Sequence, residues 1–123
     1  MEAKIKLTKT MLNKSIIDAN KSVQKFLTEE LEHTYDELEA GNKMQWNSLY
    51  EDDTPTVVTF YKAKGRGDKR ISIKNLRKFA EEGDTVKLRS ELVKIEDCIF
   101  EVRVVVSKID ETNTTTNRKT HAA

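Results

Sequence analysis

The chain has 123 residues, which is enough for one domain and too few for two domains of ordinary size. Apolar residues make up 37%, charged residues 35%, and the net charge is +1, so the apolar content is too high and the net charge too low for wholesale disorder. Cys98 is the single cysteine and no long apolar run is present, so we expect a cytoplasmic protein without an intramolecular disulfide, a signal peptide or a membrane span.

The first third of the chain predicts two short strands and one helix. Ile5 and Leu7 alternate with polar residues over 4–8, and Ile16 and Ile17 mark a second short strand over 14–18. An irregular loop would join these strands and present four polar or basic side chains, namely Lys9, Thr10, Asn13 and Lys14. A helix is expected over 20–33, because four apolar side chains recur there at helical spacing, namely Val23, Phe26, Leu27 and Leu31.

The rest of the chain predicts mostly strands. Residues 43–50 alternate in polarity, and after a turn at 51–55 the β-branched and aromatic run 56–61 has a strong strand preference. Further strands are expected over 70–73, 85–92 and 99–108. A short helix over 75–82 would carry its apolar residues on one side and end at Gly83.

These elements indicate a mainly β fold. About seven short strands and two short helices that do not alternate regularly disfavour a parallel, doubly wound sheet and favour a small barrel. From Thr112 onward the sequence has no apolar periodicity. We therefore expect one domain over 1–110 and a disordered tail or linker over 111–123.

Residue types that carry catalysis or hold a metal ion are scarce. His33 and His121 are the only histidines, and with Cys98 they are too few for a standard zinc site. Glu101 and Arg103 have the spacing of the acid and base of some magnesium nucleases, with arginine in place of lysine. We expect no catalytic residue, no metal ion and no cofactor, and keep a Mg-dependent nuclease as an alternative.

Charge alternates in sign along the chain. Residues 62–78 contain eight basic side chains and one acid, whereas residues 26–53 contain nine acids and one lysine. Such alternation can build one positive and one negative face on a nearly neutral domain. A positive face is typical of proteins that bind nucleic acid, and a solvated mixed surface is the simpler interpretation of the same composition.

The basic segment has residue types that suit DNA. Arginine donates two hydrogen bonds to guanine, a carboxylate accepts from the cytosine amino group, and lysine neutralises phosphates. Arg66, Asp68 and Arg70 are spaced so that all three would point the same way if the segment were extended. In the alternative interpretation, Asp68 merely pairs with Arg66 or Arg70 at a solvated hairpin tip.

Four parts of the sequence, in the same order, carry a resemblance to a known family. They are the strand and helix of Ser15 to Leu27, the pair Phe60 and Tyr61, the basic element Arg66 to Ile71, and the helix and strand of Leu76 to Leu88. The first three resemble the amino-terminal DNA-binding domain of EcoRII-type restriction endonucleases, a pseudobarrel also similar to the plant B-three type domains. The fourth resembles the element that follows the recognition strand in the plant class. The chain has Asp68 where the family pattern has Glu, and it lacks the Trp that follows.

The resemblance implies a DNA-binding pseudobarrel with two arms that grip the major groove of double-stranded DNA. The first arm would consist of Lys9, Thr10, Asn13 and Lys14, and the second of Lys64, Arg66, Asp68, Lys69 and Arg70, with Lys62 also contacting phosphates. The family's catalytic domain is absent, so the chain would be a non-enzymatic recognition domain of a restriction-modification system. A nuclease domain or another protein would be its second partner.

Two other functions remain open on the sequence alone. The acidic block from Glu29 to Asp53 could engage a basic partner, as in a protein-interaction module such as a phage or mobile-element inhibitor. The Mg-dependent nuclease is the second alternative.

Overall fold

The computed structural model describes residues 2–109, so the predicted tail at 111–123 lies outside the described residues. The strands and helices follow in the order β1 (Ala3–Lys6), α1 (Lys9–Lys14), β2 (Ile17–Asp18), α2 (Lys21–Glu29), the 3₁₀ helix η1 (Tyr35–Glu37), β3 (Lys43–Tyr50), β4 (Pro55–Lys62), β5 (Lys69–Ile73), α3 (Leu76–Phe79), β6 (Thr85–Glu96) and β7 (Ile99–Ile109). No helix in this part of the chain is long and apolar enough to cross a membrane.

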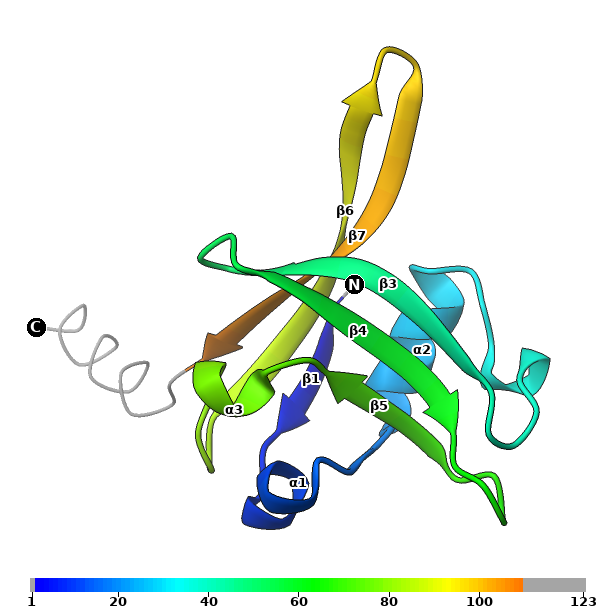
Figure 1. Ribbon diagram of the computed structural model, residues 1–123, viewed down its shortest axis with the longest axis vertical. Coiled ribbons are helices and arrows are strands. Elements are labelled where there is room, and N and C mark those ends of the chain that lie inside the picture. Colours follow the sequence, from blue (N-terminus) through cyan, green and yellow to red (C-terminus); the bar gives the residue numbers. More distant parts are fainter. Residues whose placement is uncertain (1, 110–123) are drawn as a thin grey trace, which may run out of the picture.

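All seven strands belong to one sheet, in the order β1-β6-β7-β3-β4-β5-β2. Neighbouring strands are antiparallel except β3 and β7, which are parallel. The sheet curls into half of a barrel and leaves β1 and β2 as its edges (Figure 1). The predicted mainly β fold, a small pseudobarrel of about seven strands, is confirmed.

The core lies inside this curl, where strand alternation sends every second side chain inward. Phe60 and Ile71 of neighbouring strands meet there, and α2 adds Phe26 and Leu27 from the apolar side of the helix. The helical spacing of the apolar residues therefore predicts correctly which side of α2 is buried.

The segment between β1 and β2 is a helix, α1, so the prediction of an irregular loop there was wrong and the fold has three α-helices instead of two. The Thr8 hydroxyl oxygen caps the helix by accepting a hydrogen bond from the Met11 amide at 3.2 Å. Met11 and Leu12 are partly buried against the core, and these contacts stabilise a helix too short to persist alone.

The hairpin of β6 and β7 is longer than the sequence predicts, because β6 continues to Glu96. Its outer part, residues 89–103, projects from the body as a two-stranded ribbon (Figure 1). We call this part the β6–β7 arm.

Replacing Asn20 by alanine is expected to lower the free energy of unfolding by about 1–3 kcal/mol, measured by urea denaturation. Asn20 Oδ1 accepts from the Val23 amide at 2.9 Å and so caps α2, while Nδ2 donates to the Lys4 carbonyl at 2.9 Å and ties the helix to β1. Asn13→Ala is the matched control, because Asn13 is exposed in α1 and its loss should change stability by less than about 0.5 kcal/mol. Equal losses in the two variants would contradict the capping role.

Candidate functional site

The two segments predicted to form arms lie at the same end of the molecule, opposite the β6–β7 arm (Figure 1). One is α1, and the other is the turn between β4 and β5. The four residues predicted for the first arm are all exposed, because Met11 and Leu12 turn the apolar side of α1 toward the core. They are Lys9, Thr10, Asn13 and Lys14.

The β4–β5 turn is closed rather than extended. The Ala63 amide donates to the Asp68 carbonyl at 2.9 Å, and Gly65 and Gly67 have φ angles of 87° and 73°, which favour glycine. Because the chain reverses within this turn, Arg66 does not share one extended segment with Asp68 and Arg70. The extended segment on which the expected common direction depended is therefore absent, although all three side chains line the same hollow.

Asp68 lies between the two arginines. Its carboxylate oxygen Oδ2 is 3.3 Å from a terminal nitrogen of Arg70 and 3.8 Å from one of Arg66. Arg70 also approaches Asp18 of β2, with 3.5 Å between Nε and Oδ1. The Arg70 side chain is 22% exposed and held by two carboxylates, whereas the Arg66 side chain is 90% exposed, so Arg66 is much freer to reach a ligand.

The lysines around the turn also differ. The Lys62 ammonium donates to the Leu38 carbonyl at 2.8 Å, which ties β4 to the loop before β3. The stem of Lys64 lies against Gly41, and the Gly41 amide donates to the Lys62 carbonyl at 2.9 Å. The loop before β3 thus braces the turn, while Lys64 and Lys69 are exposed.

An open hollow of about 520 Å³ lies beside the turn, with a lining from β2, α2 and the start of β5. It is lined by Asp18, Ala19, Gln24, Arg66, Asp68, Lys69 and Arg70. The Tyr35 hydroxyl donates to the Arg70 carbonyl at 2.7 Å and fixes the backbone below the hollow, and burial raises the pKa of this hydroxyl. The hollow therefore presents both hydrogen-bond donors and carboxylate acceptors, and the Tyr35 hydrogen bond holds the backbone of Arg70 in place.

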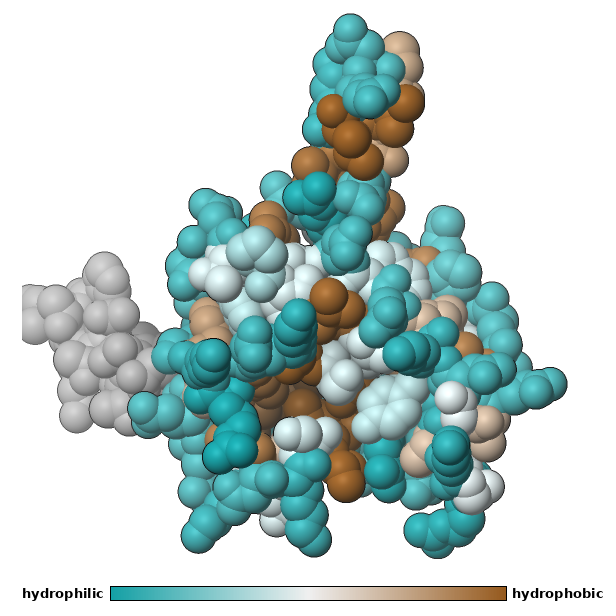
Figure 2. Space-filling model, in the orientation of Figure 1, coloured by the Kyte–Doolittle hydropathy of each residue, from teal (hydrophilic) through white to brown (hydrophobic). Residues whose placement is uncertain are grey.

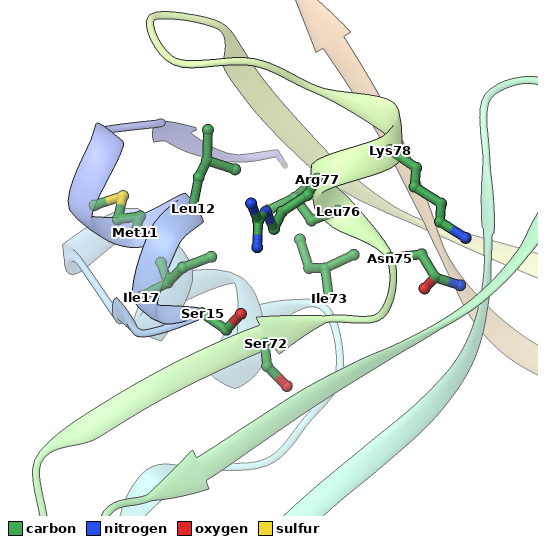
Figure 3. Close-up of a pocket in the computed structure, with 10 residues that line it drawn as sticks. All are labelled: Met11, Leu12, Ser15, Ile17, Ser72, Ile73, Asn75, Leu76, Arg77 and Lys78. Atoms are coloured by element: carbon green, nitrogen blue, oxygen red, sulfur yellow. The ribbon is translucent and has the colours of Figure 1, made fainter.

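A second cavity of about 560 Å³ separates α1 from α3. Figure 3 shows Arg77 reaching from α3 toward Leu12 of α1, above the apolar floor formed by Ile17 and Ile73. Arg77 and Lys78 belong to the basic segment but were not predicted to be part of the site. Their place beside the first arm depends on the packing of α1 against the core, which sequence spacing does not reveal.

The acids of the block from Glu29 to Asp53 are spread over several elements. The Ser90 hydroxyl donates to Glu30 at 2.9 Å and lowers the pKa of that carboxyl. The Thr34 amide lowers the pKa of Glu37, which also lies 3.1 Å from His33 Nδ1, and Asp52 accepts from the Thr54 amide at 3.0 Å. Glu30, Glu37 and Asp52 are thus each hydrogen-bonded within the fold.

The nuclease-like pair Glu101 and Arg103 lies on the β6–β7 arm and lines neither the hollow beside the turn nor the cavity between α1 and α3. The Glu101 carboxylate accepts from Arg103 Nε at 3.0 Å, so the two side chains pair with each other. Within residues 2–109, no group of three or more His, Cys, Asp or Glu side chains is arranged to hold a metal ion.

Comparison with known proteins finds no family model, no curated protein and no solved structure that matches the chain. The resemblance to the EcoRII-type domain therefore stays a prediction.

Proposed function

We propose that the chain is a sequence-selective DNA-binding module, which contacts the major groove of double-stranded DNA with the end formed by α1 and the β4–β5 turn. The observation that carries the proposal is that these two segments, both rich in exposed cations and far apart in the sequence, lie at the same end of the fold. The resemblance to restriction-endonuclease recognition domains supports the same function.

At the end of the fold formed by α1 and the β4–β5 turn, some side chains are suited to base contacts and others to phosphate contacts. Arg66 is exposed and can donate to guanine O6 and N7, and Asp68 can accept from the cytosine amino group beside it. Exposed lysines on both segments can neutralise phosphates and fix the orientation of the protein on the duplex, namely Lys9, Lys14, Lys64 and Lys69. Thr10 and Asn13 add neutral donors and acceptors from α1.

Arg70 and Lys62 serve this surface indirectly. Arg70 pairs with Asp68 and Asp18, so it holds the Asp68 carboxylate in position. Lys62 is bonded to the Leu38 carbonyl and secures the base of the turn. We therefore assign positioning roles to both side chains and direct base contact to Arg66 and Asp68.

The test is a binding selection from random DNA duplexes with the full chain at physiological salt, followed by direct titration of the enriched duplex. A DNA reader enriches a defined sequence and binds it at least about 1,000-fold more tightly than unrelated duplexes. A protein-interaction module retains no duplex, and a nuclease degrades the duplexes when Mg²⁺ is added. Either of these outcomes would overturn the proposal.

A further inference from the structure

The cavity between α1 and α3 has the size and composition of a small-molecule site. Its volume of about 560 Å³ lies within the roughly 300–1,000 Å³ of pockets that hold organic ligands. Figure 2 shows apolar residues at the bottom of a hollow between the positions of α1 and α3, with polar residues around it. The apolar lining consists of Met11, Leu12, Ile17, Ile73 and Leu76.

Both walls of the cavity are held by contacts outside it. Phe79 of α3 stacks on Tyr50 of β3, with 4.3 Å between the ring centroids. The Lys74 amide, just before α3, donates to the Val57 carbonyl at 3.0 Å. On the other side, β2 follows α1 directly and pairs with β5. The cavity is therefore formed before a ligand arrives, and binding need not order either wall.

The two segments that line the cavity are both positively charged. Residues 8–17 and 72–78 contribute every lining residue, and together they contain five bases and no acid. The bases are Lys9, Lys14, Lys74, Arg77 and Lys78. Within residues 2–109, none of these five side chains has an acidic side chain as an ion-pair partner. An uncompensated positive charge around an apolar cavity favours a ligand with an anionic group.

Arg77 is the base that faces the cavity. Figure 3 shows its side chain pointing across the cavity toward Leu12, whereas the Lys78 side chain points away from both. A guanidinium donates two parallel hydrogen bonds to a carboxylate and balances its single negative charge. A phosphate group carries nearly two negative charges at neutral pH, so one guanidinium matches a carboxylate better.

We propose that the cavity between α1 and α3 binds a small organic acid, with its apolar body on the floor formed by Ile17 and Ile73 and its carboxylate on Arg77. The floor removes the apolar body from water, and Arg77 selects the charged end. The cavity shares no lining residue with the hollow beside the β4–β5 turn. The acid site therefore goes beyond the proposed DNA contact and does not rest on it.

The test uses two pairs of probes, in which each carboxylate is matched by its neutral amide. The pairs are 2-naphthoate with 2-naphthamide and octanoate with octanamide. Each probe is titrated at neutral pH into the isotope-labelled full chain, followed by two-dimensional amide NMR. We expect a carboxylate to bind with a dissociation constant of about 0.1 to 1 mM, at least about fivefold more tightly than its amide. The largest shifts should fall on residues 11–17 and 72–78.

Arg77→Gln and Lys78→Gln form a matched pair of variants, because each removes one positive charge from an exposed position of α3. Arg77→Gln should abolish the preference for the carboxylate and leave the affinity for the amide unchanged. Lys78→Gln should keep the preference, because its side chain points away from the cavity. Amide spectra of both variants without probe check that the fold is retained.

Three results would overturn the acid site. They are equal affinity for carboxylate and amide in both pairs, shifts confined to the exposed apolar side chains of the β6–β7 arm, and an equal loss of preference in the two variants, which indicates general attraction of anions. If Arg77 contacts DNA phosphates instead, Arg77→Gln weakens duplex binding while wild type shows no preference for a carboxylate. That result would leave the proposed DNA binding intact and remove the acid site.

Discussion

Replacing Arg66 by alanine is expected to reduce discrimination between the preferred duplex and one with the contacted guanine changed, by about 5- to 150-fold. Arg66 is the most exposed arginine of the basic turn, and its contact with Asp68, at 3.8 Å, is too weak to hold it away from DNA. Its loss removes a bidentate base contact but only one positive charge. The measurement is competition fluorescence anisotropy with the two duplexes, at a fixed salt concentration.

Lysine variants separate base reading from phosphate binding. Lys64→Ala and Lys69→Ala should weaken binding to every duplex alike, and each should lower the slope of log K against log salt by about 0.9. Arg89→Ala is the matched control for Arg66→Ala, because Arg89 is a half-exposed arginine on β6 that pairs with Glu91 and lies outside the proposed DNA surface. If Arg66→Ala discriminates among duplexes as well as the Arg89 control does, Arg66 does not read bases.

Arg66 and Arg70 also show where sequence spacing stops being informative. The spacing makes the two arginines equivalent, but the structure gives Arg70 a second carboxylate from Asp18, more than fifty positions earlier in the chain. This contact exists because β2 pairs with β5, with Asp18 opposite Arg70. Pairing of a two-residue strand leaves no periodic signal in the sequence, so the contact between Asp18 and Arg70 could not be predicted.

The strands whose sequences alternate clearly between apolar and polar residues, or are rich in β-branched residues, were predicted best. β3 occupies the predicted 43–50, and β4 and β5 extend the predicted strands by a residue or two, because alternating and β-branched residues identify half-buried strands well. α1 was missed because its six residues are mostly polar, and its stability depends on the Thr8 cap and tertiary packing. The sequence identified the two basic segments that lie at the end opposite the β6–β7 arm, but it did not predict the helical form of the first.

The β6–β7 arm illustrates a different limit. Alternation in β6 and β7 predicts an apolar face and a polar face correctly, but alternation alone does not tell whether the apolar face is covered. Coverage depends on where the pairing of β1 with β6 and of β3 with β7 stops, at Leu88 of β6 and Val104 of β7, and alternation does not reveal those points. An apolar stripe in the sequence can therefore be covered by the core or remain exposed, and alternation does not distinguish the two.

Replacing Phe60 by alanine is expected to lower the free energy of unfolding by about 3–5 kcal/mol, the largest effect of a single substitution that we expect in this fold. Phe60 is fully buried and packs edge-to-face against Trp46 at 5.5 Å and Tyr35 at 6.4 Å between ring centroids. Its removal leaves a cavity under the strand that leads into the basic turn. Since small domains are stable by about 5–15 kcal/mol, the variant should be partly unfolded at mild denaturant concentrations.

Urea denaturation followed by fluorescence of the single tryptophan, Trp46, measures this loss directly. Phe100→Ala makes the same chemical change on the exposed arm and should cost less than about 1 kcal/mol. Equal losses in the two variants would contradict the assignment of Phe60 to the core.

Phe60→Ala should also affect the proposed DNA surface, because Tyr35 both packs on Phe60 and donates to the Arg70 carbonyl. In the molecules that remain folded, the backbone at Arg70 should be held less firmly, and discrimination between DNA duplexes should be weaker.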